Sequence, residues 1–191
     1  MNLGIAFHLA IPALWLAWIA YWIVAARNAK PTRWREPVGA HLLHGLPLLF
    51  CAVLLVGPRW LPPALTARIA PAGPSLPLVG AIMVAAGLGF AIWARRHLGR
   101  NWSGRVEVKK DHALVRTGPY RLVRHPIYSG LLFALAGTAL AIGEWRGAPA
   151  LACAALGFFG RIRAEEAQMR RLFPEYERYR NQTAALIPFL L

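Results

Sequence analysis

Residues 127–160 read IYSGLLFALAGTALAIGEWRGAPALACAALGFFG, an apolar run interrupted near its middle by the segment 143–147 (GEWRG) and by Pro149. Such a cluster of turn-forming and helix-breaking residues predicts a hairpin of two short helices. Apolar helices of about 17 and 14 residues are marginal for crossing a bilayer, which needs about 20. We therefore expect this pair to lean on other helices, or to extend beyond the lipid at its C-terminal end.

Three further apolar stretches precede the hairpin, at about residues 4–26, 38–56 and 76–94. A hydrophobic fraction of 57% and a mean hydropathy of +0.41 exceed what a soluble domain requires. The sequence predicts an all-α polytopic membrane protein with about five transmembrane helices, the last two as a hairpin, plus a cytoplasmic C-terminal helical segment. The first stretch continues for a spanning length without a preceding basic region, so we expect no cleavable signal peptide.

The chain is basic, with 22 Lys and Arg against 8 Asp and Glu and a net charge of +14. Most of these cations lie in segments 27–35, 95–124 and 161–180, which fall on one side of a five-helix protein. The positive-inside rule then predicts an external N-terminus and a cytoplasmic C-terminus. Because topology accounts for the charge, we expect contact with membrane lipids and no nucleic-acid partner, and the oligomeric state stays open.

The segment before the hairpin is rich in special residues. It reads RNWSG at 100–104 and HALVRTGPYRLVRHPIYSG at 112–130. Pro126 suits the first position of a helix, which makes His125 its cap and leaves free amide groups that favour an anion. Tyr128 lies one turn in, on the side facing His125. A loop that serves only topology, with its arginines on lipid head groups, is an equally good interpretation of this segment alone.

The segment after the hairpin carries half of the acidic residues. It reads RIRAEEAQM at 161–169 and LFPEYERYR at 172–180. Arg161 and Glu165 are spaced i,i+4 on one helix face, which by itself is typical of a surface ion pair. Ionisable groups at a membrane boundary become functional candidates when they face the interior of a helix bundle.

Taken together, the two segments resemble the isoprenylcysteine carboxyl methyltransferase family and its short prokaryotic, phospholipid methyltransferase-like relatives. The resemblance rests on the strings HALV, GPY, RHPIYSG, RIRAEE and FPEYERY, in order, over about residues 100–180. It implies S-adenosylmethionine as methyl donor, in a pocket reached from the cytoplasm. The residues it assigns to the cofactor are His112, Ala113, Leu114, Val115, Tyr120, His125, Pro126, Ile127, Tyr128 and Glu165, while catalytic Arg161 would face the substrate. The eukaryotic enzymes of the family have additional N-terminal helices, for which we expect no counterpart in this short chain.

We assign Glu165 to the cationic or hydroxyl groups of the cofactor, the Pro126 helix start to its carboxylate, and Tyr120 with His125 to its orientation. Arg161 would hold an acceptor carboxylate, which needs no general base. An amine acceptor would have to lose a proton, and Glu166 or His125 would then be the base. Residues 1–98 would form a membrane scaffold and residues 99–191 a catalytic core.

The first choice of activity is carboxyl O-methylation of an isoprenylcysteine-like lipophilic acceptor. Phospholipid-amine N-methylation and small-thiol S-methylation are alternatives within the same class. A sterol reductase-like enzyme that uses NADPH is a rival, against which the adjacent pair Glu165 and Glu166 argues. A non-enzymatic assembly or transport protein is a further rival and would bind neither cofactor.

Several other residues favour a structural role. His41 and His44 lack a third partner and predict helix packing rather than a metal site, and Cys51 with Cys153 lie in apolar runs. The tail tyrosines, Tyr176 and Tyr179, would seat the C-terminal segment on the bundle. Six tryptophans are interpreted as interfacial anchors and packing groups: Trp15, Trp18, Trp22, Trp34, Trp60 and Trp145.

Overall fold

Five long helices dominate a computed structural model that describes residues 3–27, 32–35, 37–57, 60–69, 73–102, 107–109 and 114–188. They are α1 (Leu3–Ala26), α2 (Val38–Val56), α4 (Ser75–Leu98), α5 (Pro126–Ile142) and α6 (Gly147–Leu172), with the short helices α3 (Pro63–Thr66) and α7 (Tyr176–Gln182) between or after them. Single 3₁₀ turns cover Gly99–Asn101 and Gly118–Arg121. The predicted all-α class and the five-helix count are confirmed.

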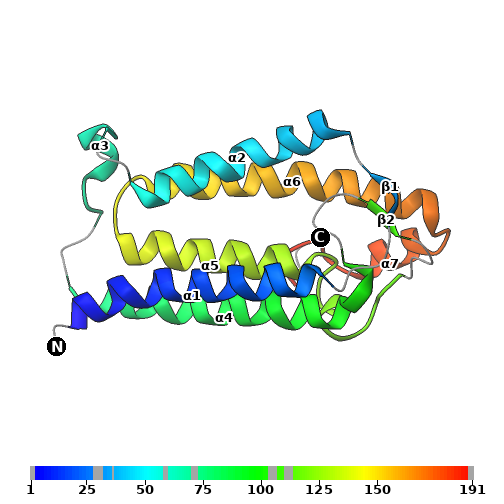
Figure 1. The fold of residues 1–191 in the computed structure, drawn as a ribbon, viewed down its shortest axis with the longest axis horizontal. Helices are drawn as coiled ribbons and strands as arrows, with labels where there is room; N and C mark the ends of the chain where they lie inside the picture. Colours follow the sequence, from blue (N-terminus) through cyan, green and yellow to red (C-terminus); the bar gives the residue numbers. More distant parts are fainter. Residues whose placement is uncertain are drawn as a thin grey trace.

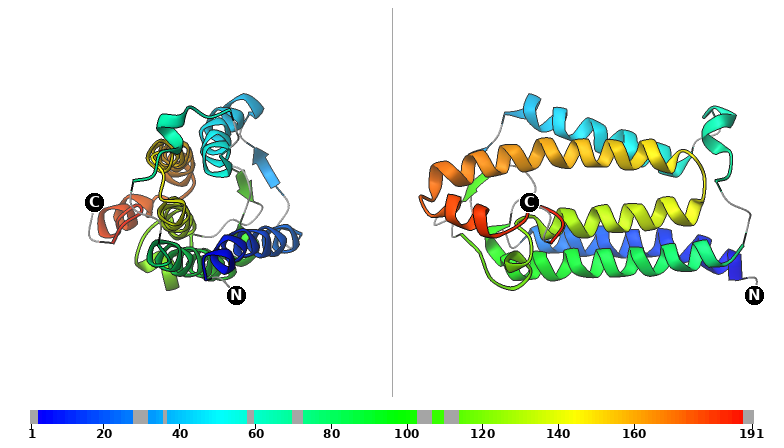
Figure 2. Two further views of the ribbon diagram at one scale, coloured as in Figure 1. Left: turned by 90° about the vertical axis from the view of Figure 1, so that its left-hand side faces the viewer. Right: turned by 180° about the vertical axis from the view of Figure 1, so that it is seen from behind.

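The long helices run side by side along the long axis of the molecule (Figure 1). In the end-on view α5 occupies the centre, between α4 and α1 on one side and α6 and α2 on the other (Figure 2). The packing follows this order, because α4 contacts α5 and α1, while α6 contacts α5 and α2. Helices α1 and α2 therefore form the two flanks of the bundle.

Within the part of the chain that the structure describes, three helices contain a stretch long and apolar enough to cross a membrane, namely Leu9–Ala26, Val38–Val56 and Ser75–Asn101. Helix α5 is apolar but shorter. Helix α6 begins after a left-handed Gly143 and continues past its apolar part to Leu172. The predicted hairpin is thus present, and its second helix extends beyond the apolar stretch as expected.

The central pair α4 and α5 packs backbone against backbone. A Cβ added to Gly130 would lie 2.5 Å from the carbonyl oxygen of Gly87, and one added to Gly137 would lie 2.6 Å from that of Gly80. Small residues that permit such an approach are typical of tightly packed membrane helices. This contact fixes the position of α5, whose N-terminal end carries His125 and Tyr128.

The connections at one end of the bundle gather the segments predicted to carry chemistry. The link between α1 and α2, the link between α4 and α5, and the end of α6 with α7 all lie there (Figure 1). One feature was not predicted: strand β1 (Thr32–Arg35) pairs antiparallel with β2 (Glu107–Lys109) and joins two of these links. The N-terminal end of α1 and helix α3 lie at the opposite end of the molecule.

Candidate active site

A cavity of about 420 Å³ lies at this end and reaches inward among the helices. Its volume is within the range of small-molecule sites, about 300–1,000 Å³. The lining of its inner part is apolar and comes from α1, α2, α5 and α6: Trp15, Trp18, Leu48, Cys51, Ala52, Leu131, Leu135 and Phe158. The lining of its outer part includes the polar side chains of Arg124, His125, Tyr128, Arg161 and Glu165. The cavity therefore suits an amphipathic ligand, or a polar ligand beside an apolar one.

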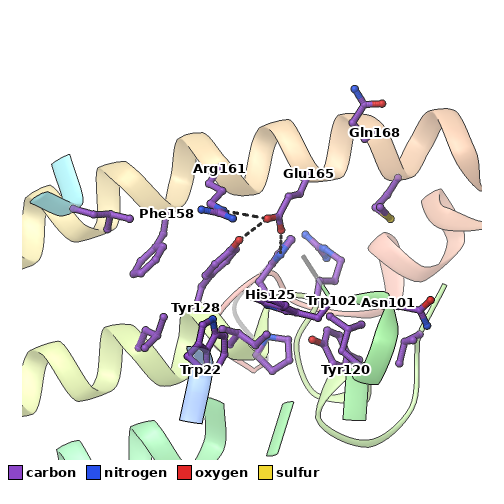
Figure 3. Close-up of a pocket in the computed structure, with 18 of the residues that line it drawn as sticks. Trp22, Asn101, Trp102, Tyr120, His125, Tyr128, Phe158, Arg161, Glu165 and Gln168 are labelled. Atoms are coloured by element: carbon purple, nitrogen blue, oxygen red, sulfur yellow. Dashed lines mark hydrogen bonds and ion pairs between the residues drawn. The ribbon is translucent and has the colours of Figure 1, made fainter. Parts of the chain in front are cut away.

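Glu165 is the hub of the polar part (Figure 3). The Tyr128 hydroxyl donates a hydrogen bond of 2.5 Å to Glu165 Oε1, and Arg161 Nε donates to the same oxygen at 3.3 Å. The second carboxylate oxygen lies 3.6 Å from His125 Nδ1. Although burial raises the pKa of Glu165, these three partners lower it further than burial raises it. The result is a fixed anion that is still 25% exposed.

Glu166 holds the other side of the His125 ring. His125 Nε2 lies 3.3 Å from Glu166 Oε1, and Arg124 Nε donates to that oxygen at 2.8 Å. Burial raises the pKa of Glu166, but the hydrogen bonds from His125 and Arg124 outweigh it and bring the pKa to about 2. Burial lowers the pKa of His125, yet its two carboxylate partners raise it above the ordinary value. The two carboxylates thus favour the protonated form of the imidazole.

The C-terminal segment binds the residues that precede α5. The amide groups of Arg124 and His125 donate to the carbonyl oxygens of Ala184 and Ala185, at 2.9 and 3.0 Å. The Arg124 guanidinium donates to the carbonyl oxygens of Arg180 and Thr183 as well. Two amides ahead of α5 are therefore occupied by the protein itself. The first-turn amides of Ile127 and Tyr128 are the ones left for an anion, because they have no intrahelical acceptor.

The residues named from the sequence come together in this one cavity. Its lining includes Leu114, Val115, Tyr120, His125, Pro126, Ile127, Tyr128, Arg161 and Glu165. Two others, His112 and Ala113, lie outside the described residues. The tail tyrosines also contribute, since Tyr176 and Tyr179 are buried and Tyr179 donates a hydrogen bond of 2.6 Å to the carbonyl oxygen of Tyr120.

Sequence reasoning missed the wall that faces Glu165. Trp22 and Trp102 lie across the cavity from Arg161 and Glu165 (Figure 3). Trp18 stacks on Trp22 with 4.5 Å between ring centroids, and Trp22 meets the edge of Trp102 at 5.5 Å. The spacing of Trp15, Trp18 and Trp22 along one face of α1 was the available signal. They do pack, as predicted, but they also line the cavity.

Comparison with known proteins bears on the same region. The isoprenylcysteine carboxyl methyltransferase (ICMT) family matches residues 79–171, from α4 to the end of α6. A "probable protein-S-isoprenylcysteine O-methyltransferase" of Oryza sativa subsp. indica is 34% identical over 116 residues, which cover 59% of this chain and 61% of that protein. The protein-S-isoprenylcysteine O-methyltransferase of Saccharomyces cerevisiae is 33% identical over 117 residues, covering 59% and 49%. The "nickel-cobalt-cadmium resistance protein NccN" of Alcaligenes xylosoxydans xylosoxydans is 35% identical over 95 residues, covering 49% and 45%. The chain thus spans about half to three fifths of the length of these relatives.

Proposed function

On the premise that residues 79–171 are related to the isoprenylcysteine carboxyl methyltransferase family, we propose that the protein is a membrane methyltransferase. It would use S-adenosylmethionine to methylate the carboxylate of a lipophilic, isoprenylcysteine-like acceptor. The observation that carries this proposal is a cavity with fixed charges at its outer end and an apolar interior. Residues 99–191 would supply the chemistry, and residues 1–98 a scaffold whose helices α1 and α2 also shape the cavity.

The residues of the outer part fit the proposed cofactor. That molecule combines an amine, a carboxylate, an adenosine and a sulfonium, and it supplies an electrophilic methyl group. Glu165 offers a partly exposed anion for its cationic or hydroxyl groups, and the Ile127 and Tyr128 amides suit its carboxylate. Leu114, Val115 and the ring of Tyr120 provide an apolar surface for the adenine.

The charge state of the site favours an acceptor that arrives as an anion. The two carboxylates beside His125 favour its protonated form, in which it cannot accept a proton, and Glu166, with a pKa of about 2, is a poor base at neutral pH. Glu165 already accepts from Tyr128 and Arg161. A carboxylate needs no deprotonation, so the site has only to align two reactants. N-methylation of an ammonium group, which needs a base, is correspondingly disfavoured.

Arg161 is the residue that we assign to the acceptor carboxylate. Its guanidinium lies 5.9 Å above the ring of Tyr128, where the polar and apolar parts of the cavity meet. A head group held there would leave its hydrocarbon in the apolar interior. The dehydrated surroundings would also favour a reaction between a sulfonium and a carboxylate, because charge is lost in the transition state.

The test is methyl transfer by purified protein in detergent or nanodiscs. Methyl-labelled cofactor would be offered with a panel of prenylcysteines, amine phospholipids and small thiols, and base-labile methyl esters would identify carboxyl methylation. Replacing Arg161 with Ala should raise the KM for the acceptor and leave the Kd for the cofactor nearly unchanged. Arg163, an exposed arginine two residues along α6, provides the matched control. Label appearing only in amines or thioethers would refute the proposed acceptor, and absence of calorimetric cofactor binding would refute the proposed class.

A further inference from the structure

Arg95 is a buried cation within the membrane-crossing part of α4. Its side chain is only 4% exposed, and no carboxylate in the described part of the chain pairs with it. Instead Nη2 donates to the carbonyl oxygen of Ala25 at 2.6 Å, and Nη1 donates to that of Gly99 at 2.7 Å. Arg95 thereby ties the C-terminal end of α1 to that of α4. Ionisable groups inside membrane segments are costly, which makes such a residue a candidate for a functional role.

The Arg95 guanidinium also contacts the cavity wall. Its central carbon lies 4.4 Å from the ring centroid of Trp102, a cation–π distance. Trp102 lies 5.5 Å from Trp22, with the ring planes perpendicular. Both indoles line the cavity, whereas Arg95 itself does not. The arginine therefore acts on a ligand indirectly, and the Trp102 ring is a part of the cavity wall that it contacts.

We propose that Arg95 is a positioning residue, a buried cation that fixes the Trp102–Trp22 wall opposite Arg161 and Glu165 and so sets the alignment of acceptor and methyl donor. This inference rests on the proposed methyl transfer. The guanidinium suits the task because one plane can stack on an indole while its edge reaches two carbonyl oxygens. The Nε atom of Arg95, which is buried, has no hydrogen-bond partner in the structure, so the stacked geometry is retained despite an unsatisfied donor.

A double-mutant cycle tests whether Arg95 acts through Trp102. Arg95→Met should lower kcat by about ten- to hundredfold, because small errors in alignment have effects of that size. The Kd for the cofactor should change less than about threefold, since Arg95 does not itself line the cavity. In a Trp102→Leu background the Arg95 substitution should have little further effect, because the ring that it holds is already absent.

Two further variants keep the test decisive. Arg96 is the exposed neighbour of Arg95, and Arg96→Met should leave kcat unchanged. If Arg95→Met does not fold, Arg95→Lys keeps a cation but loses the planar contact, and kcat should still fall about fivefold or more. Full multiplication of the Arg95 and Trp102 effects, or a fully active Arg95→Lys, would overturn the inference. A wild-type protein that transfers no methyl group to any acceptor would instead count against the proposed function.

Discussion

Replacing Glu165 with Gln removes one charge from the centre of the site and keeps the shape of the side chain. In the wild type this carboxylate is 25% exposed and interacts with Tyr128 Oη, Arg161 Nε and His125 Nδ1. Hydrogen bonds that involve an ionised group contribute about 1.5–3 kcal/mol each. If one such bond to the cofactor is lost, the Kd should rise by about ten- to 150-fold, at about 1.4 kcal/mol per tenfold.

Calorimetric titration of the variant with S-adenosylmethionine measures this change directly. Glu177→Gln is a suitable control, because Glu177 is 53% exposed and pairs with Arg170 and Arg180 outside the cavity. A second readout is the titration of His125 by NMR. With one of its two carboxylate partners gone, its pKa should fall. Unchanged cofactor affinity, in a variant whose His125 pKa does fall, would refute the assignment of Glu165 to the cofactor.

Three other predictions concern pH, packing and topology. The pKa of Glu166 is about 2 in the folded protein, below the value of about 4.3 in an unfolded chain. Its ion pairs should therefore stabilise the protein fully above about pH 4.3, and this stabilisation should be lost as the pH falls toward 2. The raised pKa of His125 has the opposite effect on stability, because its contribution is complete below about pH 6.5 and is lost as the pH rises through the folded pKa. Tm should therefore be greatest between about pH 4.3 and 6.5. In His125→Gln the fall of Tm on the alkaline side should vanish. Gly87→Val should lower the free energy of unfolding by about 1–3 kcal/mol or more, because a Cβ there would lie 2.7 Å from the backbone nitrogen of Ala134. Gly89→Val is the control, because a Cβ at Gly89 meets nothing within 4 Å. Equal Tm values for the two variants would contradict the tight packing. For topology, single cysteines would be placed in a variant without the two native cysteines and treated with an impermeant maleimide. A cysteine in α7 should react only from the cytoplasmic side, and one in the link that contains α3 only from the external side. Reaction of both from one side would exclude the proposed topology.

The fold was largely predictable because its signals are local. The segment 143–147 and Pro149 mark the hairpin turn, and Pro126 was correctly placed at the start of α5. The lengths of the apolar stretches gave the five helices. The β1–β2 pair was not predicted, because strands of four and three residues are too short to show a detectable alternation of apolar and polar residues.

The site was predictable only in part, for a related reason. Motif residues such as His125 and Glu165 were expected to lie close together, and His125 Nδ1 lies 3.6 Å from Glu165 Oε2. The carbonyl oxygens of Ala184 and Ala185 accept hydrogen bonds from the amides that precede α5. These are backbone contacts, so no side-chain pattern in the sequence could predict them. The indoles of α1 are likewise brought to the cavity by packing against α4, and a sequence pattern records the face of a helix but not its neighbour.

The glycine contacts between α4 and α5 distinguish this central pair of helices from the flanking helices α1 and α2. Helix α5 and all but the first turn of α4 fall in residues 79–171, which match the family, whereas α1 and α2 lie outside that range and pack mainly on one partner helix each. Because the two backbones touch at these glycines, larger side chains there would push α4 and α5 apart. Helices α1 and α2 supply part of the apolar lining of the cavity, including Trp15, Leu48 and Ala52. We therefore expect substitutions at these positions to change the size and shape of the apolar group that fits, without disturbing the contact between α4 and α5.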